Sequence, residues 1–242
     1  DADFEQAVST AIRAAFANQG QICLCGSRIL VQDTLYDRFR DAMVAKVSKM
    51  RIGDPLDPQT RMGAVVSRAH RDKVLAAINT ARGEGGTILC GGGRHQPAEP
   101  RLKGGFFVQP TLIEGLDHNC ITNREEIFGP VATLIPYNGK PEEAAEILGL
   151  GRGSLVSSVY SDKADFALTM TAEVAPFLGR LHLASKKVAE LSAGPGVVMP
   201  TLVHGGPGRA GGGEELGGER GLNFYMQRTA VQGYQPLLEK LK

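Results

Sequence analysis

The sequence lacks the features that mark a membrane protein or a nucleic-acid-binding protein. No apolar run approaches the roughly 18 residues that a membrane-spanning helix needs. The 27 Lys and Arg and the 26 Asp and Glu leave a net charge of +1, without the basic surplus of a nucleic-acid binder. The first residues, DADFEQ, resemble no secretory signal. We therefore expect a cytoplasmic protein with neither a membrane nor a nucleic acid as its partner.

Cysteine is scarce, with four residues in a chain of 242, which excludes a disulfide scaffold. Cys23 and Cys25 lie two positions apart, a separation at which a disulfide is sterically poor. A structural zinc site needs four ligands, and the sequence offers no second closely spaced cysteine pair, so we predict no metal. Cys23 and Cys25 are then either two buried, inert thiols or a nucleophile and a bystander. In an extended segment both side chains would point to the same side.

The rest of the composition is that of a globular protein, with 42% hydrophobic and 22% charged residues. Apolar spacing and turn residues define the expected elements. One expected helix places Leu35, Phe39, Met43 and Val47 on one face. Because strands alternate with helices, we predict an α/β fold with parallel strand pairs. We expect helices at 4–16, 34–50, 67–82, 141–148 and 162–174, and strands at 27–32, 87–90, 106–115, 131–137, 154–160 and 177–184.

The segment 204–221 holds nine glycines, too many for a regular helix or strand. We expect a loop whose backbone closely approaches another group, or a flexible lid. Residues 206–211 satisfy the pattern G-x-G-x-x-G, but the strand before them is weak and no helical pattern follows. This segment is therefore not predicted to bind a dinucleotide.

Two motifs resemble those of the aldehyde dehydrogenase superfamily. The stretch FANQGQICLCGSR matches the cysteine motif F-x-N-x-G-Q-x-C-x-x-x-x-R at six positions, which are Phe16, Asn18, Gly20, Gln21, Cys23 and Arg28. About a hundred residues later, NREEIFGPV resembles the second motif of that family. The segments DPLDPQTRMGAVVS and GGFFVQPTLIEGL match the region between them, so the resemblance covers essentially the whole chain.

The resemblance implies the catalytic domain of that fold, with a doubly wound, mostly parallel sheet. It implies that Cys23 is the nucleophile and Cys25 the bystander. Cys23 would add to an aldehyde to form a thiohemiacetal, pass a hydride to NAD or NADP, and release the acid when water attacks the thioester. Glu126 and Phe128 match the positions that face the nicotinamide half of the cofactor. A small-molecule aldehyde and further copies of the chain, in a dimer or tetramer, are the implied partners.

The two ends of the chain resemble different branches of the family. The stretch from 199 to 233 resembles dehydrogenases of CoA-linked semialdehydes from aromatic degradation, such as 3,4-dehydroadipyl-CoA semialdehyde. The first half resembles 2-hydroxymuconic semialdehyde dehydrogenases. We expect a catalytic domain at 1–203 and a Gly-rich loop with an oligomerisation or return segment at 204–242. Arg209 is the candidate for binding a negative group of the substrate.

The resemblance corresponds to roughly the last half of that family. The amino-terminal cofactor domain and the glutamate general base are therefore expected to be absent from this chain. Two hypotheses follow. The chain is part of an aldehyde dehydrogenase that works when the amino-terminal half is supplied, or it is a non-catalytic α/β module that mainly assembles with itself.

Overall fold

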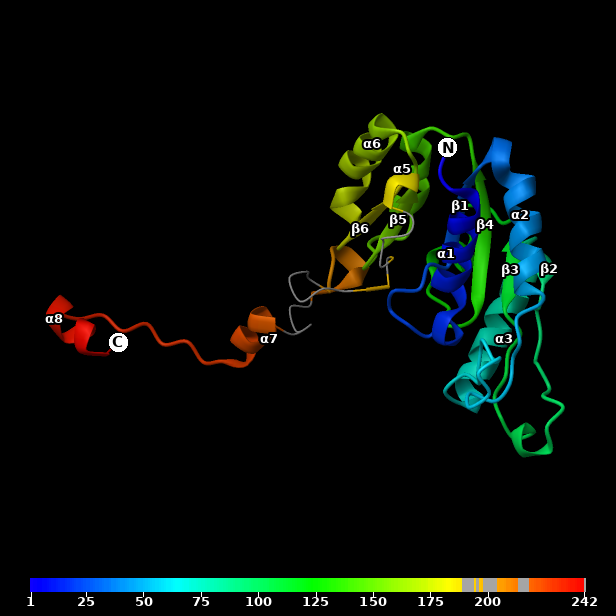
Figure 1. Cartoon of the computed structure of the whole chain (residues 1–242), viewed down its shortest axis with the longest axis horizontal. Helices are drawn as coiled ribbons and strands as arrows, with labels where there is room; N and C mark the ends of the chain where they lie inside the picture. Colours follow the sequence, from blue (N-terminus) through cyan, green and yellow to red (C-terminus); the bar gives the residue numbers. More distant parts are fainter. Residues whose placement is uncertain (189–193, 195, 198–203, 213–217, 242) are drawn as a thin grey trace.

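The structure is a computed structural model, and it describes residues 1–188, 194, 196–197, 204–212 and 218–241. Helices and strands alternate along most of the chain (Figure 1). The helices are α1 (Phe4–Phe16), α2 (Asp33–Val47), α3 (Arg68–Gly83), α4 (Ile121–Arg124), α5 (Pro141–Gly149), α6 (Ala164–Val174), α7 (Gly218–Tyr225) and α8 (Gln235–Leu238). The strands are β1 (Arg28–Gln32), β2 (Thr87–Cys90), β3 (Thr111–Glu114), β4 (Val131–Tyr137), β5 (Ser157–Tyr160) and β6 (Leu181–Ala184).

The main sheet has the strand order β1-β4-β3-β2. The pairs β1/β4 and β4/β3 are parallel, whereas β2 runs antiparallel to β3. The expected α/β fold with a mostly parallel sheet is therefore confirmed. Strand β2 lies beside β3 at the edge of the sheet. A single antiparallel strand at the edge is common in mostly parallel sheets.

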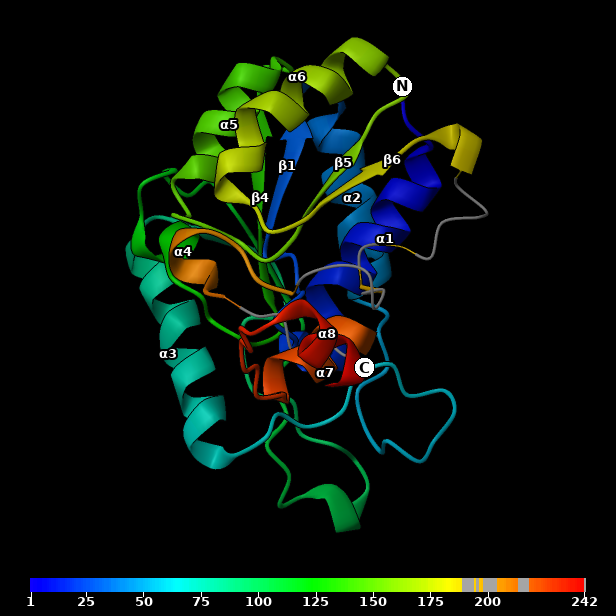
Figure 2. The same ribbon diagram turned by 90° about the vertical axis from the view of Figure 1, so that its left-hand side faces the viewer.

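Both faces of the main sheet are covered by helices, as a doubly wound fold requires. On one face, Ala132 and Leu134 of β4 pack with Phe16 of α1 and Met43 of α2. On the other face, the neighbouring Val131 packs against α3. Successive strand residues point to opposite faces, which explains why β4 is buried almost throughout. Figure 2 shows α3 on one side of the sheet and α1 and α2 on the other.

Strands β5 and β6 form a separate, parallel, two-stranded sheet. Its core is made with α5 and α6 and includes Val159, Met170 and Val174. Arg28 ties this unit to the main sheet, because its guanidinium donates to the carbonyl oxygens of Ile147 and Leu148 at the end of α5, at 2.9 and 3.2 Å. Arg28 of the cysteine motif therefore has a structural contact at the junction of the two sheets.

Several local expectations need correction. The strands expected at 154–160 and 177–184 are shorter, Ser157–Tyr160 and Leu181–Ala184. The strand expected at 106–115 is shorter, Thr111–Glu114, and Pro110 just before it has no N–H to give to a ladder. Leu35 is 36% exposed, so the buried face of α2 consists of Phe39, Met43 and Val47. Helix α7 begins at Gly218, inside the segment expected to be irregular, and Glu219 in its first turn suits a helix N-terminus.

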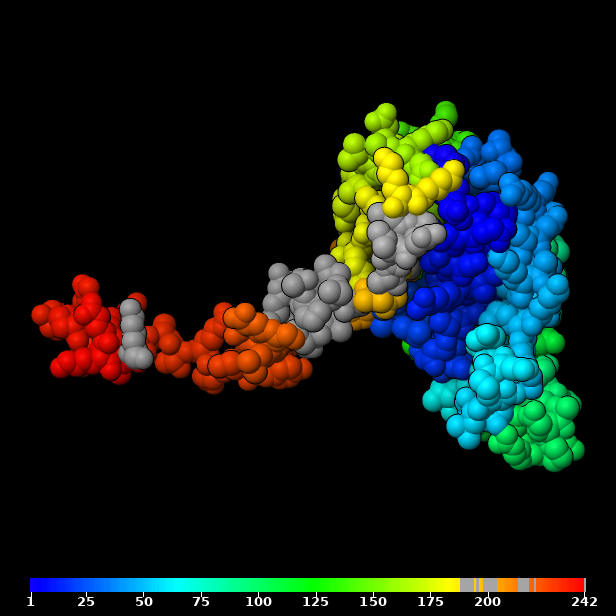
Figure 3. All heavy atoms as spheres, viewed as in Figure 1, coloured from blue at the N-terminus to red at the C-terminus, as the bar shows by residue number. Residues whose placement is uncertain are grey.

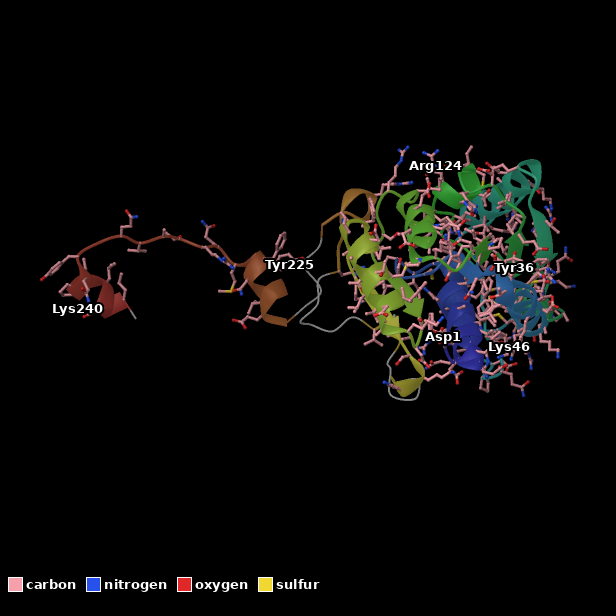
Figure 4. The ribbon with its side chains drawn as sticks, turned by 90° about the horizontal axis from the view of Figure 1, so that it is seen from above. Asp1, Tyr36, Lys46, Arg124, Tyr225 and Lys240 are labelled. Atoms are coloured by element: carbon pink, nitrogen blue, oxygen red, sulfur yellow. The ribbon has the colours of Figure 1, made fainter. Side chains whose placement is uncertain are left out.

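Residues 218–241 form an arm that leads away from the rest of the molecule (Figure 3). Viewed from above, Tyr225 and Lys240 lie along this arm, far from Arg124 on the body (Figure 4). The arm exposes many large apolar side chains, which are Leu222, Phe224, Tyr225, Met226, Val231, Tyr234, Leu237 and Leu241. Among the described residues, no helix has both the length and the apolar character to cross a membrane.

Candidate active site

Cys23 lies on a tight turn between α1 and β1. The N–H of Cys25 donates to the carbonyl oxygen of Ile22 at 2.9 Å, so this segment is folded back and not extended. The two thiols consequently differ in environment. Cys23 is exposed, whereas the Sγ of Cys25 is partly buried, 3.9 Å from the carbonyl oxygen of Ala17. Burial is the main reason why the pKa of the Cys25 thiol is raised, which favours its unreactive, protonated form.

The approach to this turn has an unusual backbone. Asn18, Gln19 and Gly20 have φ angles of 48°, 59° and 67°, so three consecutive residues are left-handed. A Cβ atom on Gly20 would overlap the carbonyl oxygen of Gly129. Only glycine fits there, because the position needs both a positive φ and a close backbone approach. The contact joins the cysteine motif to the motif E-I-F-G-P.

Glu126 and Phe128 lie beside this contact, and both side chains are exposed. The charge of Glu126 contributes to raising the pKa of Cys25, although burial is the main cause. Phe128 has a φ of 58°, and its carbonyl oxygen accepts a hydrogen bond from Nε2 of His70 at 2.7 Å. His70 therefore fixes the backbone at the point where Phe128 presents its ring to solvent.

Helix α4, just before Glu126, is anchored by Glu84. The Glu84 carboxylate accepts hydrogen bonds from the backbone N–H groups of Ile121 and Thr122, at 2.7 and 3.1 Å, and from the Thr122 hydroxyl at 2.5 Å. Burial raises the pKa of Glu84, but these hydrogen bonds outweigh it and the pKa is lowered overall. The ionised carboxylate therefore stabilises the start of α4.

Arg209 holds the other end of α4. Its guanidinium donates to the carbonyl oxygen of Arg124 at 2.7 Å and forms an ion pair with Glu125 at 2.8 Å. Glu125 had no role in the sequence analysis, and it proves to be the partner of the expected substrate-binding arginine. In this structure Arg209 thus fastens the Gly-rich segment to the residues that immediately precede Glu126.

The backbone of the Gly-rich segment closely approaches the body of the protein. This was one of the two expectations for the segment, the other being a flexible lid. A Cβ atom on Gly179 would overlap the carbonyl oxygen of Gly205, and one on Gly153 would overlap that of Pro207. The group that this loop approaches is therefore the backbone beside β5 and β6. The N–H of Arg209 also donates to the carbonyl oxygen of Arg152 at 3.0 Å.

This packing places His204 next to the exposed thiol, a neighbour that the sequence analysis did not identify. The Nε2 atom of His204 lies 3.0 Å from the Sγ of Cys23. The sequence offered one hint, a histidine immediately before the glycines, but 181 positions separate His204 from Cys23. Pairing a lone nucleophile with a distant histidine requires the fold, because such partners are adjacent only in space.

A cavity of about 380 Å³ opens behind the turn, between α1 and the β5/β6 sheet. Ile22, Leu24 and Cys25 line one side, and Tyr160 and His182 line the other. Within the described ranges, no group of three or more His, Cys, Asp or Glu side chains is placed to hold a metal ion.

Comparisons with known proteins identify the family and the fold. The sequence model of the aldehyde dehydrogenase family matches residues 1–231. The chain is 37% identical to 2-aminomuconic semialdehyde dehydrogenase of Mus musculus, over 78% of this chain and 36% of that protein. It is 31% identical to 4-trimethylaminobutyraldehyde dehydrogenase of Homo sapiens, over 96% of this chain and 44% of that protein.

A crystal structure of an aldehyde dehydrogenase also matches the fold of this chain. Betaine aldehyde dehydrogenase of Staphylococcus aureus, a P449M point mutant in complex with NAD⁺, superimposes with a TM-score of 0.80 and 32% identity. The match covers 93% of this chain and 43% of that one. The chain thus spans less than half the length of these relatives. It belongs to the aldehyde dehydrogenase family.

Proposed function

We propose that this chain is the catalytic part of an NAD(P)-dependent aldehyde dehydrogenase, with Cys23 as the nucleophile. The observation that carries the proposal is the contrast between the two thiols. Cys23 is exposed on a tight turn, while Cys25, two positions later, is partly buried with a raised pKa. Within a family that oxidises aldehydes, the exposed thiol is the one that a substrate can reach.

The proposed reaction begins when the Cys23 thiolate adds to the aldehyde carbon and forms a thiohemiacetal. The N–H of Cys23 itself would help to hold the developing oxyanion, since a fixed backbone dipole needs no reorganisation during the step. Once the hydride has left, the substrate remains on Sγ as a thioester, which water hydrolyses to the acid. The resemblance to the family implies that the general base for that water comes from an amino-terminal half.

Glu126 and Phe128 fit the nicotinamide half of NAD or NADP, which accepts the hydride when bound. Both side chains are exposed next to the cysteine turn, and their backbone is held by His70 and by the anchors of α4. A carboxylate at Glu126 can accept hydrogen bonds from two ribose hydroxyls, and the Phe128 ring can pack on the sugar or ring face. Glu126→Gln should slow hydride transfer in single-turnover kinetics and leave alkylation of Cys23 unchanged; a normal rate would remove Glu126 from the cofactor site.

The decisive test compares the two cysteines in an enzyme completed with an amino-terminal half. Cys23→Ala is expected to abolish aldehyde oxidation, and Cys25→Ala is the matched control that should keep most of it. Equal losses, or a loss only in the Cys25 variant, would contradict the assignment. If the completed protein turns over no aldehyde at all, the alternative of a non-catalytic assembly module takes its place.

A semialdehyde from aromatic degradation is the proposed substrate, either CoA-linked or free. The similarity to a protein named 2-aminomuconic semialdehyde dehydrogenase supports this class. Comparing kcat/KM for a CoA-linked and a free six-carbon semialdehyde decides between them, and the CoA-linked form is expected to be preferred.

Arg209 is the proposed contact for a negative group of that substrate. Because its guanidinium already pairs with Glu125, a substrate anion would have to displace this carboxylate. Arg209→Ala should then raise KM for the CoA-linked form about tenfold, a loss of about 1.4 kcal/mol of binding. Glu125→Gln should lower KM, since it frees the guanidinium. If both variants raise KM, Arg209 serves only to hold α4 in place.

The arm at 218–241 is the proposed contact between copies of the chain in a dimer or tetramer. A monomer rarely leaves so many large apolar side chains exposed along one short segment. Removing residues 218–242 should lower the number of chains per particle, obtained by light scattering as the molar mass of the particle divided by that of one chain. An unchanged number of chains per particle would show that the arm does not hold the assembly together.

A further inference from the structure

His204 touches the thiol that the proposed function makes the nucleophile. The distance of 3.0 Å between its Nε2 and the Sγ of Cys23 is within reach of direct proton transfer. Histidine is the side chain that most often accepts protons in catalysis, because its ordinary pKa lies near neutral pH. The thiolate, and not the thiol, is the nucleophilic form of cysteine.

The position of His204 is set by the loop that follows it. Gly205 is buried, and its carbonyl lies so close to Gly179 that no side chain fits between them. A Cβ atom on Gly206 would come within 2.9 Å of the carbonyl oxygen of Ser154. The N–H of Gly179 in turn donates to that same oxygen at 2.9 Å. His204 thus directly precedes a backbone segment that packs against Gly179 and Ser154, the residues before β6 and β5.

Within the described residues, the hydrogen-bond contact of the second thiol of the turn is a backbone carbonyl oxygen and not an imidazole. The Sγ of Cys25 faces the carbonyl oxygen of Ala17, which can accept a hydrogen bond but cannot take up the proton. Cys23 can therefore transfer its proton to the neighbouring imidazole, whereas the carbonyl oxygen beside Cys25 cannot accept a proton. The two thiols of the motif differ in chemistry as well as in exposure.

We propose that His204 is the proton acceptor of Cys23, so that this chain carries both the nucleophile and the base that activates it. The inference rests on the proposed function, in which Cys23 attacks the aldehyde. In this step the S–H bond breaks and a bond forms between the proton and Nε2, which gives a thiolate beside an imidazolium. The thiolate electron pair then forms the new S–C bond, and the carbonyl π pair moves to oxygen.

Alkylation of the 242-residue chain by iodoacetamide isolates this step from the cofactor and from the amino-terminal half. Here the thiolate forms an S–C bond, the C–I bond breaks, iodide leaves and the proton stays on His204. Mass spectrometry of peptides follows the rate at each cysteine, and Cys25 serves as the internal reference. A thiol of ordinary pKa is only a few per cent thiolate at pH 7, so a fully ionised one reacts up to about thirtyfold faster.

At pH 7, His204→Ala is expected to slow alkylation of Cys23 about ten- to thirtyfold and to leave Cys25 unchanged. His204→Gln should be equally slow, because an amide can hydrogen-bond to sulfur but cannot accept its proton. Free imidazole should restore part of the rate in His204→Ala only. His118→Ala, a histidine outside the site, is the control and should react as the unaltered chain does.

Two results would overturn the inference. Unaltered alkylation in His204→Ala would show that the base is elsewhere, and an unaltered rate in His204→Gln would show that a hydrogen bond suffices. Neither result bears on the assignment of Cys23 itself, which fails if Cys23→Ala and Cys25→Ala lose activity equally in the completed enzyme, or if only Cys25→Ala loses it. Unchanged far-UV circular dichroism of each variant confirms that a slow rate is not the result of misfolding.

Discussion

Replacing Gly20 by alanine tests whether the contact between the two motifs builds the site. At a φ of 67°, an L-residue pays roughly 1–2 kcal/mol for the left-handed backbone. The new Cβ would also overlap the carbonyl oxygen of Gly129, and such overpacking costs about 1–3 kcal/mol. The lower entropy of the unfolded alanine chain returns about 0.5–1 kcal/mol. We expect Gly20→Ala to lower the free energy of unfolding by about 1–4.5 kcal/mol.

Gly115→Ala is the matched control for this substitution. Gly115 has a similar φ of 76°, but a Cβ atom there meets nothing within 4 Å. It shares the backbone cost and the entropy term with Gly20, so the difference between the two variants measures the overlap alone. With a urea m-value of about 2 kcal/mol/M, an overlap of 2 kcal/mol moves the unfolding midpoint by about 1 M.

Because the chain contains no tryptophan, unfolding is best followed by far-UV circular dichroism. Equal midpoints for Gly20→Ala and Gly115→Ala would refute the reasoning, since the contact with Gly129 would then contribute nothing beyond the backbone angle. A second readout is local. Gly20→Ala should change the alkylation rate of Cys23, three positions away, whereas Gly115→Ala should not.

Two further predictions concern the anchors around the site. Glu84→Gln should destabilise the chain by about 1–2 kcal/mol at pH 7, because it removes a charged acceptor from the start of α4. Folding lowers the pKa of Glu84. The ionised carboxylate therefore stabilises the folded chain fully at pH values above the unfolded-state pKa of a glutamate, about 4.3. This contribution is lost as the pH falls through the lower pKa of the folded state. Urea midpoints of the two proteins should therefore converge in acid, and a constant difference down to pH 2 would contradict this. Arg28→Met should lower the free energy of unfolding by about 1–3 kcal/mol, since two partly buried carbonyls at the end of α5 lose their donor. A urea midpoint equal to that of an exposed control such as Arg61→Met would show that Arg28 is not needed there.

The sequence predicted the main elements well, because their apolar periodicities are local. Helix α3 begins after Ser67, whose side chain accepts a hydrogen bond from the N–H of His70, as a helix start signal at that position implies. Strand β4 appears at the expected residues, since a run of apolar residues between turn signals needs no tertiary information. The separation of β5 and β6 into their own sheet was not foreseen, because strand pairing depends on contacts distant in sequence.

The candidate site could be predicted from the sequence only at residues that belong to a family motif. The resemblance pointed to Cys23, Glu126 and Phe128, and the structure brings their two motifs into contact through Gly20 and Gly129. The partners of Arg209 and the neighbour of Cys23 carry no local signal. Their positions follow from glycine backbones that pack against one another, and such contacts leave no periodic pattern in a sequence.

The separation between Cys23 and His204 also has a consequence during synthesis. A ribosome that adds about 5–20 residues per second needs roughly 10–40 s to cover the 181 positions between them. Throughout that interval the thiol exists without the imidazole that is proposed to take its proton. During this interval, oxidants and electrophiles around the nascent chain meet a thiol of ordinary reactivity. In the proposed mechanism, the thiol becomes fully nucleophilic only when the segment around His204 has been made and has packed beside Cys23.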